Sequence, residues 1–374
     1  MNKLVVLNKL VVGNLLHRPL RTLISMFAVA IEIIMILCIV AIMYGMLNGS
    51  KTRTSGVGMD MIVKPSGTTM FNGVGGAPAP VKIADILRKQ AHVAVVSPVI
   101  IQLTSGSALE NIYGIDYASF NGLRPFVFLA GGPFQQPYDV IVDDYFARAD
   151  HGHHVGETIS IIKHDFRICG IVEHGKGGRK FIPLDTLADL TGSPGKASVF
   201  YIKSDSLGNQ ELIRSEIEAL PGIKGAYEVQ TLEELMSQMT PEHLPAFTAG
   251  LDTVIGIAVI IGFLVIFQSM YTAVMERTRE IGILKSLGAS QGYIVSVVLR
   301  ETALISIVGI ALGIAATFAI RTGIHLRFPT LDFLITGGWV VRGALIAFIG
   351  ALLGAAYPAL KAARKDPIDA LAYE

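Results

Sequence analysis

The chain has 374 residues, of which 51% are hydrophobic, and its mean hydropathy is +0.53. This is too apolar for a soluble protein of this length, so we expect membrane-spanning segments. The formal net charge of +1 implies no polyanionic partner such as nucleic acid. Cys38 lies in an apolar run and Cys169 in a polar region, so we expect no disulfide framework.

An apolar run at residues 20–47 follows a mildly amphipathic segment, residues 1–19, and predicts a first transmembrane helix after an N-terminal elbow helix. A signal peptide is the alternative, because the start is basic and the core is apolar. We reject it, since the run is long enough to cross a bilayer and no clear small-x-small cleavage site follows it.

Glu32 lies near the middle of this first span. A carboxylate at the bilayer centre costs several kcal/mol unless it is shielded, so we expect it to face protein or water. Two interpretations stay open. Glu32 lines a path or senses a substrate, or it is a protonated or hydrogen-bonded structural residue in a helix interface, near Gln268 or Ser269.

Residues 48–245 differ in composition, with glycine, proline, charge and short alternating strands. They predict one inserted α+β domain, large enough for its own core. Separate strands are expected at residues 93–96 and 100–103. We expect the basic loop at residues 174–180 to be a mobile surface hairpin tip, the alternative being contact with headgroups or an acidic partner. His151, His153 and His154 could bind a transition metal, but a solvated loop is favoured, and we predict no metal site.

Three further spans are predicted at residues 246–275, 291–320 and 339–360. Glycines four residues apart allow close helix packing, and we expect it in the third and fourth spans; the pairs are Gly309 with Gly313 and Gly350 with Gly354. Arg300 and Glu301 lie at the cytosolic mouth of the third span, where we expect them to form an interfacial pair with the preceding loop.

The distribution of basic residues predicts the topology. Lysine and arginine are frequent near the N-terminus, in the segment between the second and third spans, and in the tail at residues 361–374. Four spans place all three on one side, which is then cytoplasmic. The loop between the third and fourth spans is also basic, which conflicts mildly with this assignment.

The segment at residues 276–290 carries charges in its first turn, and Ile281, Leu284 and Leu287 recur at intervals of three. This pattern predicts a short amphipathic helix, and Gly288 is a plausible stop for it. Such a helix between two spans suits a part that docks a cytosolic protein. The alternative is an arginine-rich loop that only sets topology.

The same segment reads Glu-Arg-x-Arg-Glu-Ile-Gly-Ile-Leu-Lys-x-Leu-Gly-Ala and resembles the coupling-helix signature of the FtsX/MacB/LolCE-like ABC-transporter permeases. The entry to the first span, Asn-Leu-Leu-x-x-Pro-Leu-Arg-Thr, and the ending Pro-x-x-x-Ala-x-x-x-x-Pro-x-x-Ala-Leu-x-x-Glu are similar to the same family. The order of elements in the inserted domain resembles the family's periplasmic core domain. The resemblance implies four transmembrane helices, with the α+β domain between the first and second and outside the cytoplasm.

The resemblance also implies which residues couple the chain to an ATPase. Arg277, Arg279 and Glu280 would contact a groove in the ATPase, while Ile281, Leu284 and Leu287 would pack on the base of the membrane helices. The full set of expected coupling residues is Glu276, Arg277, Arg279, Glu280, Ile281, Leu284, Lys285 and Gly288.

The expected partners are two copies of an ABC ATPase subunit and a second permease copy or homologue, and a periplasmic adaptor (membrane-fusion) protein stays open. The sequence lacks Gly-x-x-x-x-Gly-Lys-Ser/Thr, so ATP and magnesium would bind to the partner, with no cofactor and no catalysis on this chain. We expect a multi-pass protein of the bacterial cytoplasmic (inner) membrane with both termini in the cytoplasm.

Mechanotransmission for export or extraction of a lipophilic or peptide substrate is the favoured function. The alternative is a signal relay that activates a cell-wall hydrolase or a sensor without transport. A membrane enzyme that uses residues 151–154 with Asp143 and Asp144 is disfavoured, because no nucleophile, base and orienting group converge in the sequence.

Overall fold

The computed structural model of the chain describes residues 13, 19–68, 79–105, 109–149, 152–243, 245–328 and 330–365. The chain forms two compact units. The first, which we call the helical unit, contains residues 1–45, 244–326 and 333–374; the second, the sheet unit, contains residues 46–243 and 327–332. The expected elbow helix at residues 1–19 lies almost entirely outside the described residues.

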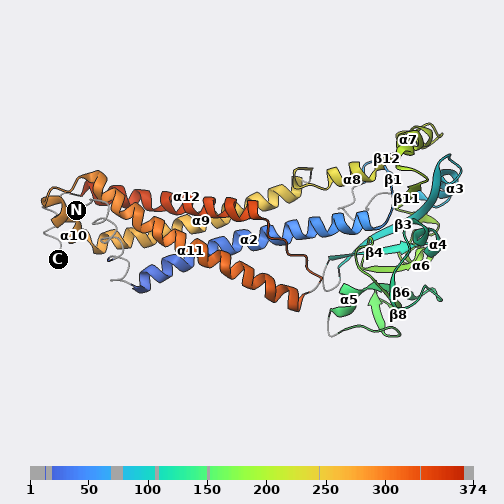
Figure 1. Ribbon diagram of the computed structural model, residues 1–374, viewed down its shortest axis with the longest axis horizontal. Coiled ribbons are helices and arrows are strands. Elements are labelled where there is room, and N and C mark those ends of the chain that lie inside the picture. Colours follow the sequence, from blue (N-terminus) through green and yellow to red (C-terminus); the bar gives the residue numbers. More distant parts are fainter. Residues whose placement is uncertain are drawn as a thin grey trace. The chain divides into compact units, whose positions relative to one another are not determined.

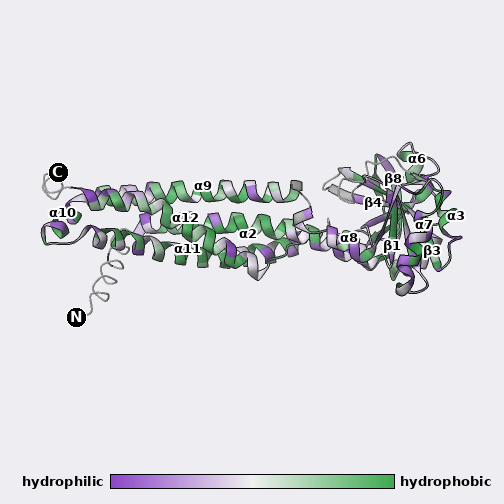
Figure 2. Ribbon diagram, turned by 90° about the horizontal axis from the view of Figure 1, so that it is seen from above, coloured by the Kyte–Doolittle hydropathy of each residue, from purple (hydrophilic) through white to green (hydrophobic). Residues whose placement is uncertain are grey.

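The helical unit is built from helices that run side by side (Figures 1 and 2). Their bounds are α2 (Pro19–Gly56), α9 (Pro245–Glu276), α10 (Thr278–Ser286), α11 (Gln291–Arg327) and α12 (Gly337–Arg364). Within the described residues, four of them are long and apolar enough to cross a membrane, and α10 is the short one. Proline stands at the first position of α2 and α9, where its missing N–H costs nothing. The last turns of α2 belong to the sheet unit.

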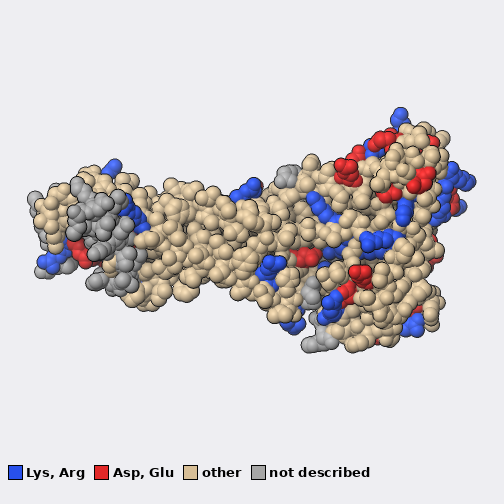
Figure 3. Space-filling model, in the orientation of Figure 1, with Lys and Arg blue, Asp and Glu red and all other residues tan. Residues whose placement is uncertain are grey.

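A core of aliphatic side chains holds the helical unit together, with Val29, Ile33, Ile266 and Ile305 almost fully buried. Helix α12 presents an alanine at every fourth position from Ala347 to Ala359 and packs along α9. Small side chains in this row let the two backbones approach closely. In the view of Figure 3 the middle of the helical unit is almost free of charge, and charged side chains appear toward its ends, including the end that carries α10.

Three of the four predicted packing glycines lie at close helix contacts. A Cβ at Gly309 would lie 2.7 Å from the Met26 carbonyl oxygen, and one at Gly313 would lie 2.7 Å from that of Ala30. At Gly354 the corresponding distance to the Phe263 carbonyl oxygen is 2.8 Å. Gly350 differs, because its nearest neighbours would be 3.9 Å away, an ordinary contact.

The sheet unit is a mixed sheet in the order β12-β1-β11-β3-β4-β9-β6-β8-β5, with β7 paired to β8 and a separate β2–β10 pair. The strands are β1 (Met61–Pro65), β2 (Ala79–Pro80), β3 (Val93–Ser105), β4 (Leu109–Ile115), β5 (Phe128–Gly131), β6 (Asp139–Asp143), β7 (Thr158–Ile161), β8 (His164–Val172), β9 (Lys180–Pro183), β10 (Lys196–Ala197), β11 (Val199–Ser204) and β12 (Tyr227–Thr231). Pairs β4–β9 and β6–β8 are parallel, and the others are antiparallel.

Short helices connect these strands. They are α3 (Ile83–Leu87), α4 (Tyr117–Leu123), α5 (Asp144–Arg148), α6 (Leu184–Leu190), α7 (Gln210–Glu218) and α8 (Leu232–Gln238), with single 3₁₀ turns at Leu207–Asn209 and Pro241–His243. Two apolar clusters fill the unit, one around Phe200 and Ile213, the other around Phe166 and Ile182. The predicted membrane helices with an inserted α+β domain between the first two are therefore confirmed.

Two expectations for the sheet unit are wrong. Residues 93–96 and 100–103 are not separate strands, because Pro98 pairs with Phe200 within one continuous β3. The loop at residues 174–180 is not a mobile hairpin tip. The side chain of Lys176 is buried, with its ammonium donating to the carbonyl oxygens of Phe120 and Arg124 and lying 3.8 Å from the centre of the Phe126 ring.

The histidine cluster is described only in part, since His151 lies outside the described residues. His153 stacks on Phe146 and pairs with Glu157 at 2.9 Å. Among the described residues no group of three histidine, cysteine or acidic side chains is placed to hold a metal ion.

Candidate coupling site

The chain breaks its helical course between α9 and α10 at a single residue, Arg277. Its backbone angles of −105° and 16° are not helical, so α10 starts in a new direction. At the other end, Gly288 has a φ of 92°, in the left-handed region that glycine reaches without steric cost. The amides of Gly288 and Ala289 donate to the carbonyl oxygens of Lys285 and Leu284, which forms a Schellman motif. The predicted stop at Gly288 is confirmed.

A cluster of ion pairs fixes the beginning of α10 within the helical unit. Arg277 donates to both carboxylate oxygens of Glu301 in α11, at 3.2 and 3.4 Å. Arg21 of α2 lies 3.8 Å from the same carboxylate and 3.1 Å from Glu276. Glu301 is only 4% exposed, and the two guanidinium groups are the counter-charges of this buried carboxylate. The break between α9 and α10 is thereby tied to α2 and α11.

The inner face of α10 packs on the helical unit. Ile281 and Leu284 contact its apolar core, and Thr278 and Gly282 are buried. The ammonium of Lys285 donates to the carbonyl oxygens of Ala363, at 2.9 Å, and Lys365. Lys285 therefore satisfies carbonyl groups that the end of α12 would otherwise leave without partners.

Two side chains at α10 do not lie where the sequence predicts them. Arg277 points to Glu301 and is not presented outward. Leu287 does not pack on the membrane helices, because its side chain is 80% exposed. The reason is geometric: each step of three residues falls about 60° short of a full turn, so two steps rotate Leu287 well away from Ile281.

The exposed surface of α10, which we call the outer face, combines charge with apolar area. It is formed by Arg279, Glu280, Ile283, Ser286 and Leu287. Ile283 is 45% exposed, and the sequence analysis did not single it out. Its position could have been predicted from the spacing of four residues that separates Ile283 from both Arg279 and Leu287, because this spacing places all three on one side of a helix.

Glu32 lies at the meeting point of α2, α9 and α12 and is 4% exposed. Gly262 of α9 makes room for it, because a Cβ there would lie 1.9 Å from a Glu32 carboxylate oxygen. Both oxygens lack a hydrogen-bond partner among the described residues. The expected neighbourhood of Gln268 or Ser269 is therefore wrong, and Ser269 instead bonds to Ser25 at 2.5 Å.

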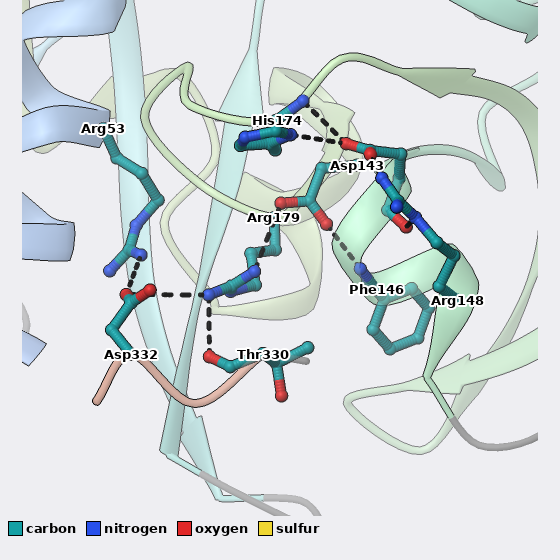
Figure 4. A network of polar contacts seen from close by, with 9 residues as sticks. Arg53, Asp143, Phe146, Arg148, His174, Arg179, Thr330 and Asp332 are labelled. Carbon is teal, nitrogen blue, oxygen red and sulfur yellow. Dashed lines mark hydrogen bonds and ion pairs between the residues drawn. The ribbon is translucent and has the colours of Figure 1, made fainter. Parts of the chain in front are cut away.

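A second polar network lies within the sheet unit and holds the segment between α11 and α12 (Figure 4). Arg179 donates to the carbonyl oxygen of Thr330 at 2.8 Å. It also lies 3.5 Å from Asp143 and 3.9 Å from Asp332. Arg53, in the last turns of α2, pairs with Asp332 at 3.4 Å. The loop at residues 327–332 and the end of α2 thus share one network with β6.

Asp143 is the buried member of this network, with 1% of its surface exposed. Burial raises the pKa of its carboxyl group, while Arg179 and the amide of Phe146 favour the charged form. The Phe146 amide donates to Asp143 at 2.7 Å, so Asp143 also caps the start of α5. The neighbouring Asp144 accepts from the amide and ring nitrogen of His174, both at 2.9 Å, and pairs with Arg148.

Comparisons with known proteins agree with this architecture. Residues 22–220, over half of the chain, match the MacB-like periplasmic core domain, and residues 253–367 match the FtsX-like permease C-terminal family. The chain therefore belongs to the FtsX-like and MacB-like family of ABC-transporter permeases, multi-pass proteins of the cytoplasmic membrane.

Individual relatives cover different parts of the chain. It is 33% identical over 41% of its length to the uncharacterized ABC transporter permease YknZ of Bacillus subtilis, and 27% identical over 96% of its length to the macrolide export ATP-binding/permease protein MacB of a Shewanella strain. The matches span 38% and 59% of those relatives' own lengths. The crystal structure of the periplasmic region of MacB from Actinobacillus actinomycetemcomitans is 16% identical, with a TM-score of 0.38, over 49% of this chain and 94% of that one.

Proposed function

We propose that the chain is the permease subunit of a mechanotransmission-type ABC transporter, driven by a separate ATPase subunit through α10. The observation that carries the proposal is the contrast between the two faces of α10. Its inner face is tied to the helical unit by buried side chains and by Lys285, while its outer face presents Arg279, Glu280, Ile283 and Leu287 without cover from the described residues.

A force on α10 would reach the other helices through contacts that lie close to it. The Arg277–Glu301 pair transmits it to α11, and Arg21 transmits it to α2. Because α10 is only nine residues long and held at both ends, it would move as a rigid part with its neighbours. Covalent continuity then leads to the sheet unit, through α2, through α9 and through residues 327–332, which belong to that unit.

In this proposal the ATPase subunits, two copies, bind ATP and magnesium, and this chain supplies no cofactor site and no catalytic group. The movement of the core domain exports or extracts a lipophilic or peptide substrate on the far side of the membrane. A second permease copy or homologue completes the membrane part, and both termini lie on the cytoplasmic side with α10.

Co-purification of the detergent-solubilised full chain, read by mass spectrometry, tests this function. Wild type is expected to recover an ABC ATPase, and Glu280→Lys to lose it. Glu233→Lys, the same charge reversal on an exposed residue of α8, serves as the control and should keep it. Recovery of the ATPase by Glu280→Lys at the wild-type level, or by neither form, would argue against the proposal. A co-purifying adaptor would favour export, and a co-purifying hydrolase or sensor would favour the relay.

A further inference from the structure

A groove of about 590 Å³ lies between the end of α9, the inner side of α10 and the end of α12. Among the described residues, its walls contain four cationic side chains, Lys285, Lys361, Arg364 and Lys365, and no carboxylate. The apolar part of its lining includes Val274, Ile281, Tyr357 and Leu360. The groove is separate from the outer face of α10, since it shares no residue with it.

The cations of the groove differ in how they are engaged. Lys285 donates to the backbone at the end of α12, so its charge contributes to the potential of the groove but its donors are used. Lys361 is exposed, and its ammonium lies 2.8 Å from the Tyr271 hydroxyl and 4.7 Å from the centre of that ring. Arg364 is also exposed, three residues further along the same helix. Lys361 and Arg364 therefore form a cationic rim on one side of α12.

Next to this rim the groove is apolar. Tyr357 and Leu360 are 57% and 47% exposed, so they offer apolar surface beside the rim. Val274 and Ile281 continue the apolar wall inward. The groove thus joins an apolar channel to a rim that favours negative charge.

We infer that this groove binds an anionic phospholipid. Its phosphate group would lie between Lys361 and Arg364, and an acyl chain would lie against Tyr357 and Leu360. Charge complementarity carries the choice, because the four cations among the described lining residues favour an anionic over a zwitterionic occupant. The apolar wall beside the rim favours a ligand that also carries an acyl chain. Tyrosine with lysine at the end of a membrane helix is also typical of the bilayer interface, where such headgroups lie.

The inference rests on the membrane-spanning character of the chain and not on the proposed coupling role of α10. It adds a consequence for that role, because Ile281, Gly282 and Lys285 belong both to the groove and to the inner side of α10. A bound lipid would therefore stiffen the connection between α10 and α12. An ATPase could fail to bind while the lipid still binds, so the two ideas fail separately.

The experiment uses the full chain in detergent and measures its unfolding temperature with phosphatidylglycerol, with phosphatidylcholine of the same acyl chains, and with glycerol phosphate. Phosphatidylglycerol is expected to raise Tm saturably by about 2–5 °C, since a ligand that binds only the folded state stabilises it. The other two additives are expected to leave Tm unchanged. Native mass spectrometry should show the same order in retained lipid.

Variants locate the effect. Lys361→Gln with Arg364→Gln should abolish the phosphatidylglycerol shift, while the charge-conserving pair Lys361→Arg with Arg364→Lys should keep most of it. The matched control, Arg321→Gln with Arg342→Gln, removes two exposed cations elsewhere on α11 and α12 and should leave the shift intact.

An equal shift with phosphatidylcholine, an equal shift with glycerol phosphate, or no shift with phosphatidylglycerol in wild type would each overturn the inference. The last outcome is the one expected if another part of the chain fills the groove. If the charge-conserving pair also loses the Tm shift with phosphatidylglycerol, Lys361 and Arg364 contribute to folding and not to lipid binding, which would overturn the inference too.

Discussion

Arg277 and Glu301 are joined by two contacts, at 3.2 and 3.4 Å, at a point where the Glu301 side chain is almost fully buried. A buried carboxylate between two arginines is weak evidence for extra stability, but removing one partner leaves an uncompensated charge. The pair therefore fixes the direction in which α10 leaves α9.

We predict that Glu301→Gln lowers the free energy of unfolding by about 3–5 kcal/mol, because Arg277 and Arg21 then lose their shared counter-charge. Thermal unfolding of the detergent-solubilised chain measures this. Glu276→Gln is the control, because Glu276 is 38% exposed in its pair with Arg21, and such pairs contribute less than about 1 kcal/mol. Equal losses for the two variants would contradict a special role of Glu301.

A second prediction concerns the packing glycines. Gly313→Ala places a methyl group 2.7 Å from the Ala30 carbonyl oxygen, so it should cost about 1–3 kcal/mol through strain between α2 and α11. Gly350→Ala is the matched control in α12 and should change stability little, since its nearest neighbours lie 3.9 Å away. If both variants lose the same stability, close packing at Gly313 does not explain the loss, and neither does helix propensity, because alanine favours a helix more than glycine does.

A third prediction concerns Arg179, which holds residues 327–332 through Thr330 and Asp332. Arg179→Ala should increase amide hydrogen exchange at residues 330–332 by about ten- to a hundredfold, because hydrogen bonds to charged groups contribute roughly 1.5–3 kcal/mol. Arg179→Lys keeps the charge beside Asp143 but loses the forked geometry of the guanidinium group. Its exchange rate should therefore lie between those of wild type and Arg179→Ala. Unchanged exchange in Arg179→Ala would mean that the network does not hold the loop.

A fourth prediction follows from Lys176, whose pKa is lowered from 10.5 to about 7 by burial. Between these values the unfolded chain binds a proton that the folded chain lacks. Stability should therefore rise as pH increases from about 7 to about 10, by up to a few kcal/mol, and the cost of the buried charge is complete below pH 7. Lys176→Met should be more stable at pH 7 and should flatten this part of the pH profile. A profile that falls from pH 7 to 10 in wild type alone would contradict the assignment.

The sequence predicts the long apolar helices well, because hydropathy over some 20 residues needs no tertiary information. It also predicts the stop at Gly288, which depends on local backbone geometry. The faces of α10 were harder to predict. A spacing of three residues resembles a helical stripe, but it drifts around the helix, and this drift separates Leu287 from Ile281.

The sequence alone did not predict which charged side chains are buried. Lys176 stands in a glycine-rich basic loop that looks like solvated surface, yet its ammonium contacts two carbonyl oxygens and an aromatic ring contributed by distant residues. Likewise, Arg53, Arg179 and Asp332 come from three separate parts of the chain, so no local pattern links them. Such networks depend on topology, which only the fold provides.

The most direct test of the proposed coupling is photo-crosslinking from α10 in cells. A photoreactive phenylalanine analogue in place of Leu287 or Ile283, on the outer face, is predicted to form an adduct with an ABC ATPase. The same analogue in place of Leu284, on the inner face, should form none. Adducts with an ATPase from position 284 but not from 287 or 283, or from none of the three, would contradict the account of α10 as the docking helix.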